Sequence, residues 1–263
     1  MKIATATATA TAIAACAALA LAGCAGGGNQ GKARAQANQV LDQLKPIADP
    51  GRVAADDLTF AREARLAGIA RAIDDHAAIA AKARINGSPY PAERWMIPSS
   101  GKQTVIWAPR LVWSSCDGSL AVTTGVFARE GANWGRYANV WERQETREYV
   151  LTYSFGLPDA DLTRLRRARP ADQTAPENEI VVEGLDFIDG KVADCTTPPV
   201  VQPAGTPDAN ILGAASGAAR DSTLRWFVTF LKDGSARFTS YVWNGSAWDN
   251  VQQLPLSPSG STG

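Results

Sequence analysis

The apolar residues of this chain follow a helical spacing in its N-terminal third and a strand-like spacing afterwards. A short helix is predicted over residues 32–48, and small and apolar residues recur every three or four positions over residues 58–84. The second stretch is typical of one long helix, or of two helices with a bend near residue 74. Asp56 or Asp57 is the expected N-cap of this helix, because short polar side chains accept hydrogen bonds from the first free backbone N–H groups.

After residue 104 apolar and polar residues alternate, which indicates strands with one buried face. The alternation predicts an antiparallel meander of at least four strands by residue 155. A second meander is predicted at residues 224–251, where Asp233-Gly234 and Asn244-Gly245 favour tight hairpin turns. Helices followed by antiparallel strands predict an α+β fold. Residues 252–263 form a polar tail.

The composition indicates a folded domain that does not bind nucleic acid. The 263 residues include 26 Lys and Arg, 26 Asp and Glu, eight Trp, seven Phe and five Tyr. This aromatic content is enough for an apolar core. A nucleic-acid-binding surface, by contrast, needs an excess of positive charge.

The N-terminus has the pattern of a secretory signal peptide at residues 1–23. Lys2 is followed by an uncharged, Ala- and Thr-rich run that ends in small residues. Residues 21–24, Leu-Ala-Gly-Cys, resemble the lipobox of bacterial lipoproteins, in which the cysteine receives a diacylglyceryl group. The resemblance implies a lipoprotein that begins at Cys24 and is held to the lipid bilayer by its acyl chains, palmitate among them. The alternative is an ordinary signal peptide with an incidental Cys24.

Residues 24–53 are predicted to form a lipid-anchored tether and a short helix. The tether is Gly-rich at residues 25–31, a composition typical of flexible linkers. Residue 25 is Ala rather than Asp. If the source is Gram-negative, resemblance to the usual sorting pattern implies the outer membrane, with the protein facing the periplasm.

Two cysteines remain for a disulfide. Cys16 leaves with the signal peptide and Cys24 is acylated, so Cys116 and Cys195 form an even pair in a compartment that permits disulfides. The alternative is two free thiols.

A longer resemblance covers residues 57–156. The segments Trp107–Gly125 and Gly135–Gln144 contain W-x-P, S-x-D-G-x-L-x-x-T-x-G and Y-x-x-V-W-x-R-Q in that order. They resemble uncharacterised bacterial secreted members of the SnoaL-like, nuclear-transport-factor-2-like superfamily. The resemblance implies helices packed across a strongly curved, cone-like antiparallel sheet with a pocket between them. The predicted domain, including the C-terminal meander, spans residues 54–251. An acid that such members often carry after the last strand is missing at residues 149–156, so its role is not transferred.

The sequence offers one weak catalytic candidate, the pair Asp75 and His76. His76 is the only imidazole in the chain, and a carboxylate beside it could serve proton transfer, as in isomerases and dehydratases of that superfamily. The alternative is a polar stripe on a helix. Because zinc, phosphate-loop and nucleophile-elbow motifs are absent from the sequence, we expect no metal and no cofactor.

Aromatic residues are the other candidates for a site. Tyr137 and Trp141 are four positions apart on one predicted strand and therefore share a face. Together with Tyr153 on the next strand they could line a cavity for a small apolar ligand, or form ordinary core. The sequence favours a binding module for such a ligand or for a partner. The alternatives are an isomerase- or dehydratase-like enzyme and a structural envelope lipoprotein. The oligomeric state is not indicated.

Overall fold

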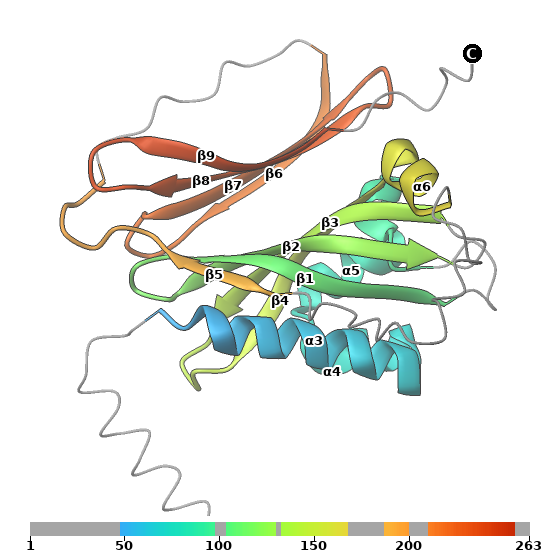
Figure 1. The fold of residues 1–263 in the computed structure, drawn as a ribbon, viewed down its shortest axis with the longest axis horizontal. Coiled ribbons are helices and arrows are strands. Elements are labelled where there is room, and N and C mark those ends of the chain that lie inside the picture. The colour runs from blue at the N-terminus through green and yellow to red at the C-terminus, as the bar shows by residue number, and fades with distance from the viewer. Residues whose placement is uncertain (1–47, 98–103, 130–132, 168–186, 200–209, 256–263) are drawn as a thin grey trace, which may run out of the picture. The chain divides into compact units, whose positions relative to one another are not determined.

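The computed structural model describes residues 48–97, 104–129, 133–167, 187–199 and 210–255 (Figure 1). The chain divides into two units, residues 1–45 and 46–263, and all described residues belong to the second. The predicted signal peptide, Cys24, the tether and the short helix at 32–48 therefore lie outside the described residues. No helix within the described ranges is long and apolar enough to span a bilayer.

The predicted long helix is divided into three. The helical elements are α3 (Pro50–Ala67), α4 (Ile69–His76), α5 (Ile79–Gly87), the 3-10 helix η1 (Pro91–Arg94) and α6 (Ala160–Arg167). Gly68, with φ of 91°, separates α3 from α4. The prediction of Asp56 or Asp57 as N-cap is wrong, because α3 begins earlier. Asp49 caps it by accepting a 3.0 Å hydrogen bond from the backbone of Arg52, and Pro50 occupies the first turn.

Five strands form a mixed sheet, here called sheet A. They are β1 (Val105–Ser114), β2 (Leu120–Arg129), β3 (Asn133–Arg143), β4 (Tyr149–Pro158) and β5 (Asp189–Val192). Their order is β4-β3-β2-β1-β5. The first four form the predicted antiparallel meander, whereas β5 pairs in parallel with β1.

A second, antiparallel sheet, sheet B, contains the predicted C-terminal meander. Its strands, in the order β6-β7-β8-β9, are β6 (Ile211–Ala218), β7 (Leu224–Leu231), β8 (Ala236–Trp243) and β9 (Trp248–Pro255). The turns at Gly234 and Gly245 have φ of 82° and 96°, a region that favours glycine. The hairpin predictions are confirmed, and the described residues form an α+β fold with two sheets. β9 continues beyond the predicted domain end at residue 251.

Sheet A is buried on both faces (Figure 1). Trp141 of β3 belongs to one core cluster with Phe60 of α3. Its neighbour Val140 belongs to a second cluster with Phe238 of sheet B. Helices therefore cover one face of sheet A and sheet B covers the other.

A β-bulge in β4 reverses the faces of its side chains. Val140 pairs with Tyr153 and Trp141 pairs with Leu151, so Thr152 is the extra residue. Leu151 belongs to the core on the helix side, whereas Tyr153 belongs to the core against sheet B. The bulge thus moves the second half of β4 out of the face predicted by simple alternation.

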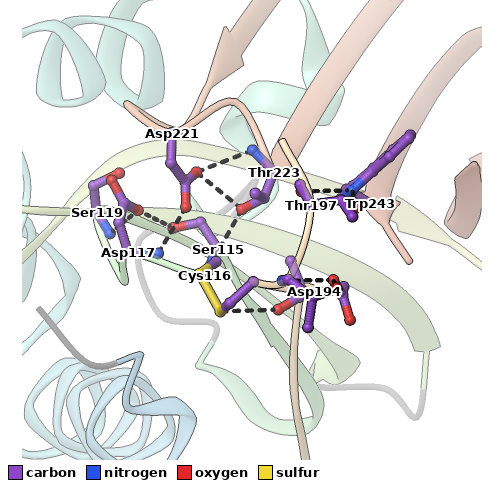
Figure 2. Close-up of a disulfide and its surroundings, with 12 residues drawn as sticks. Ser115, Cys116, Asp117, Ser119, Asp194, Thr197, Asp221, Thr223 and Trp243 are labelled. Carbon is purple, nitrogen blue, oxygen red and sulfur yellow. Dashed lines mark hydrogen bonds between the residues drawn. A yellow bond between two sulfur atoms is a disulfide. The ribbon is translucent and has the colours of Figure 1, made fainter. Parts of the chain in front are cut away.

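A disulfide stands where the turns of both sheets meet (Figure 2). Cys116, between β1 and β2, and Cys195, after β5, lie 5.3 Å apart at Cα and 79 residues apart in sequence, which confirms the predicted pairing. The backbone N–H of Cys116 donates to the Thr223 hydroxyl at 2.8 Å, in the turn between β6 and β7. The backbone N–H of Asp194 donates to the carbonyl of Trp243 at 2.9 Å. The bridge and its neighbours therefore join sheet A to sheet B.

Candidate functional site

The structure brings together two of the three aromatic residues that were expected to line a ligand cavity. Tyr137 and Trp141 both face the helices, as their spacing predicts, and both are fully buried. The ring of Tyr137 stacks on Trp95 at 5.1 Å, and Trp141 meets Phe60 edge-on at 6.1 Å. Tyr153 lies on the opposite face of sheet A. The two aromatics on the helix side are therefore packed among other rings, and Tyr153 belongs to a different environment.

A buried carboxylate lies beside Tyr137. Asp57 of α3 has no exposed surface and accepts hydrogen bonds from the Trp107 indole N–H at 2.9 Å and from the Thr123 hydroxyl. The Tyr137 hydroxyl lies 3.5 Å from each carboxylate oxygen. Burial raises the pKa of Asp57 to about 6, and the hydrogen bonds from Thr123 and Trp107 oppose the rise.

The Asp57 cluster connects helix and sheet. Donors from three strands converge on Asp57: Trp107 of β1, Thr123 of β2 and Tyr137 of β3. The Trp141 indole N–H in turn donates to the Thr123 hydroxyl at 3.2 Å. Sequence reasoning missed this role of Asp57 because it placed the residue at a helix end. Once α3 is extended to Pro50, the helical spacing of Val53, Asp57 and Phe60 puts the carboxylate on the buried face.

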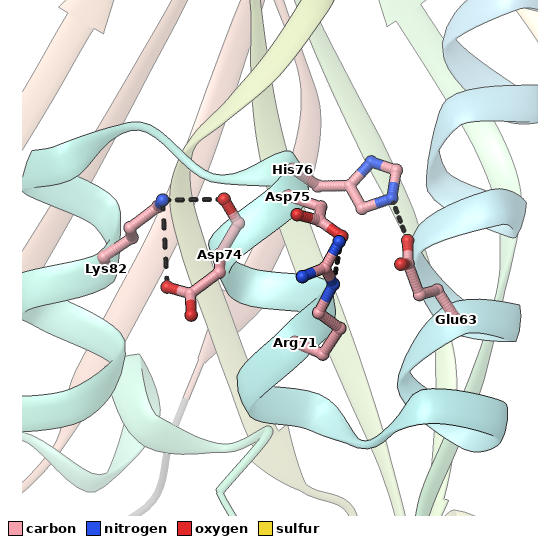
Figure 3. A network of polar contacts seen from close by, with 6 residues as sticks. All are labelled: Glu63, Arg71, Asp74, Asp75, His76 and Lys82. Atoms are coloured by element: carbon pink, nitrogen blue, oxygen red, sulfur yellow. Dashed lines mark hydrogen bonds and ion pairs between the residues drawn. The ribbon is translucent and has the colours of Figure 1, made fainter.

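The predicted pair Asp75 and His76 does not form (Figure 3). His76 Nε2 lies 2.7 Å from Glu63 Oε2, and the two side chains are 20% and 28% exposed. Asp75 instead pairs with Arg71 at 2.6 Å on the same helix. The His76 ring also packs on Phe60 at 5.5 Å. The imidazole thus has a carboxylate partner thirteen residues away, which adjacency in the sequence could not reveal.

A groove opens on the other side of sheet A, where terminal strands of the two sheets meet α5. Its volume is about 680 Å³. It is lined by Ala78, Ala80 and Arg84 from the α5 region, Glu142, Thr152 and Tyr153 from sheet A, and residues 214–217 and 226–229 from sheet B. Tyr153 is thus the one predicted ligand-binding aromatic that borders this groove.

The inward-facing side chains of β6 that line the groove are small. Ala215 and Gly217 face inward, opposite Val228 and Trp226 of β7. A Cβ atom on Gly217 would lie 2.5 Å from Trp226 Nε1, so any residue larger than glycine would clash with the indole at its present position. The indole N–H is buried against this strand and has no hydrogen-bond partner among the described residues.

Tyr153 is held in place by a polar cluster around the buried carboxylate of Glu93. The Tyr153 hydroxyl and the Ser88 hydroxyl both donate to the carboxylate of Glu93, which is 2% exposed. Arg84 Nη1 donates to the same carboxylate at 3.2 Å, and its guanidinium lies 5.5 Å from the Tyr153 ring centre. Burial and the bond to Glu93 raise the pKa of Tyr153. The phenol therefore stays neutral, and its ring is fixed beside Trp226 at 4.5 Å.

Within the described ranges, no three His, Cys, Asp or Glu side chains are placed to hold a metal ion. The sequence matches no protein-family model, no curated protein and no solved structure.

Proposed function

We propose that this protein is a binding module, anchored to the bacterial envelope through acylated Cys24, that holds a small apolar ligand in the groove between β4 and β6. The observation that carries the proposal is the groove itself, with a volume of about 680 Å³. Its lining includes the buried residues Tyr153 and Trp226 and the partly exposed Thr152, Ala215 and Phe227. Sites for small molecules commonly have volumes of roughly 300–1,000 Å³ and aromatic walls with a few fixed polar groups.

The chemistry of the wall favours an apolar ligand. The Tyr153 hydroxyl is occupied by Glu93, so this buried residue contributes apolar surface and no free donor to the groove. Trp226 stacks on Phe238 with ring centres 6.2 Å apart, and this contact holds the Trp226 ring in position. Arg84 is paired with Glu93 but its side chain is 46% exposed, and it supplies the polar end of the groove.

The relation to the SnoaL-like superfamily and the cone-like curvature of sheet A belong to the same proposal. An antiparallel meander with α3 against one face supports them: Phe60 meets Trp107 edge-on at 5.1 Å. The pocket implied by that resemblance would lie between helices and sheet, where Tyr137 and Trp141 are fully buried. Tyr153 and Trp226 are buried to a similar extent, 2% and 5% exposed, so burial alone does not choose the face. We assign the ligand to the opposite face because the groove opens there.

The anchor is tested by acylation. The apolar run before Leu-Ala-Gly-Cys supports Cys24 as the acylated residue, and at least two acyl chains are needed for stable membrane binding. Globomycin should block processing of the wild-type protein, and Cys24→Ser should abolish labelling with radioactive palmitate. Cys16→Ser is the matched control and should label normally. Continued labelling of Cys24→Ser would refute the anchor.

The groove is tested by ligand retention. Full-length protein purified from its own envelope is examined by native mass spectrometry and by solvent extraction of bound small molecules. Ala215→Phe should fill the groove from its β6 wall and remove the bound species. Ala218→Phe makes the same change on the exposed side of the same strand, outside the groove, and should leave the bound species in place.

Thermal melting separates loss of binding from loss of fold. Both phenylalanine variants should melt cooperatively, and a folded Ala215→Phe protein without the bound species supports the groove. Wild-type protein that carries no small molecule, or equal retention in both variants, would contradict the proposed function.

A further inference from the structure

The outer side of α3 groups leucine and arginine side chains on one solvent-facing surface. The inner side of the helix buries Val53 and Phe60 against sheet A. Helical residues three or four positions apart lie side by side, and four such residues are exposed on the outer side: Leu58, Arg62, Arg65 and Leu66. The two leucines are 42% and 70% exposed. We call this surface the Leu–Arg face.

The charge of the Leu–Arg face is positive and is not neutralised by the described residues. Its two arginines form no ion pair or hydrogen bond with any residue that the structure describes. The carboxylates of the same helix are engaged or turned elsewhere. Asp57 is buried, Asp56 is half-buried, and Glu63 lies 2.7 Å from His76 (Figure 3). The complement of the Leu–Arg face is therefore an anionic surface.

We propose that the Leu–Arg face lies against the anionic surface of the bilayer that holds the acyl chains of Cys24. This placement rests on the acylation of Cys24 proposed above and not on a ligand in the groove. Because α3 begins at Pro50, 26 positions after Cys24, the chain between them can extend at most ~90 Å. A tether of this length makes contact with the bilayer intramolecular, so a few side chains are enough for it.

The chemistry of the four side chains fits a layer of lipid headgroups. Leucine enters the boundary between headgroups and acyl chains, and guanidinium groups pair with phosphate oxygens in a bidentate manner. A soluble protein fits less well as the partner. Specific protein interfaces bury roughly 800 Å² on each partner, which is more than four side chains of one helix provide.

The test places a nitroxide label on the Leu–Arg face of the acylated protein, reconstituted in vesicles of phosphatidylcholine and phosphatidylglycerol. Leu66→Cys supplies the thiol, since Cys24 is acylated and Cys116 and Cys195 form the disulfide. Oxygen concentrates in hydrocarbon and a nickel chelate stays in water, so the collision rates of the label with the two report its depth. The label should collide more with oxygen and less with the chelate than a label at Leu212→Cys, an exposed leucine of β6 that is the matched control.

Reversal of one charge tests the arginines. Arg62→Glu in the Leu66→Cys protein should lower the ratio of membrane-bound to free label at least ~5-fold, because a charge attracted by the bilayer is replaced by one that is repelled. Arg237→Glu makes the same change at an exposed position of β8 and should leave the ratio unchanged. Circular dichroism confirms that both variants are folded.

Flotation with the vesicles separates the anchor from the contact of α3. Protein that floats while its label at position 66 meets the chelate as freely as the control label would overturn the contact alone. The same conclusion would follow from equal shielding in vesicles of phosphatidylcholine only, or from an Arg62→Glu variant that behaves like its parent. Wild-type protein that does not float would overturn the proposed anchor and the contact with it.

Discussion

The indole N–H of Trp107 donates a 2.9 Å hydrogen bond to Asp57 inside the core between α3 and sheet A. The carboxylate has no exposed surface, and burial raises its pKa from the usual 3.8 to about 6. An ionised carboxylate at this depth is costly unless donors surround it. Trp107 and Thr123 supply those donors from the sheet. The titratable carboxylate of Asp57 therefore connects α3 to sheet A.

Replacing Asp57 with Asn should remove a pH dependence of stability. The folded-state pKa is raised to about 6, so the folded protein holds the proton more tightly than the unfolded chain does between about pH 4 and 6. This contribution is fully present below the unfolded pKa and is lost as the pH rises through the folded pKa. Relative to Asp57→Asn, the wild-type free energy of unfolding should therefore fall by up to about 3 kcal/mol as the pH rises through this window. Urea denaturation at each pH measures it, and identical pH profiles would contradict the prediction.

Trp141→Ala should destabilise the fold without emptying the groove. Trp141 is fully buried on the helix side of sheet A, and removing a buried aromatic costs about 3–5 kcal/mol. The free energy of unfolding should fall by that amount, while the molecule bound to folded protein stays in place. Trp134→Ala, at a half-buried end of β3, is the control and should cost less. Loss of the bound molecule from folded Trp141→Ala protein would contradict the assignment of the ligand to the face of sheet A that is turned toward sheet B.

Some features could be predicted from the sequence because they depend on neighbouring residues. Asp233-Gly234 and Asn244-Gly245 mark their hairpins, since glycine is suited to the positive φ that each turn requires. The pairing of Cys116 with Cys195 follows from the sequence by elimination, on the expectation that Cys16 leaves with a signal peptide and Cys24 is acylated, and the structure has this disulfide.

Other features depend on contacts between distant segments. The bulge at Thr152 is invisible in the alternation of β4, and it sends Tyr153 to the opposite face from Tyr137. β6 has small residues instead of the β-branched and aromatic residues that signal a strand, so its edge and the groove wall could not be predicted. The sequence pattern predicts that the helix begins at Asp56 or Asp57, several residues after Pro50, and therefore puts Asp57 at a helix end rather than on the buried face.

Loss of the disulfide should weaken the whole domain. The bridge closes a loop over a separation of 79 residues, which in the chain-entropy model contributes about 4–5 kcal/mol. Chemical denaturation of the Cys116→Ser, Cys195→Ser double variant should show a loss approaching this value. Alkylation of the unreduced wild-type protein should label neither cysteine. Two reactive thiols at these positions would refute the bridge.

His76→Ala separates binding from catalysis. His76 and Glu63 are 20% and 28% exposed and share one hydrogen bond, a contact whose net contribution is about 0.5–1.5 kcal/mol. We therefore expect a small change in melting temperature and unchanged retention of the bound molecule, with Glu63→Gln behaving alike. A catalytic His76 would behave differently: turnover of the bound molecule would disappear in a folded His76→Ala protein, by roughly 10²–10⁴-fold.

The most direct measurement is a crystal structure of the full-length protein purified from its own envelope without removal of lipids or small molecules. We predict density for a small apolar molecule in the groove, in contact with its lining at Thr152, Ala215 and Phe227 and ending near Arg84. Density between the helices and sheet A, beside Tyr137 and Trp141, would contradict it, as would a groove that contains only water.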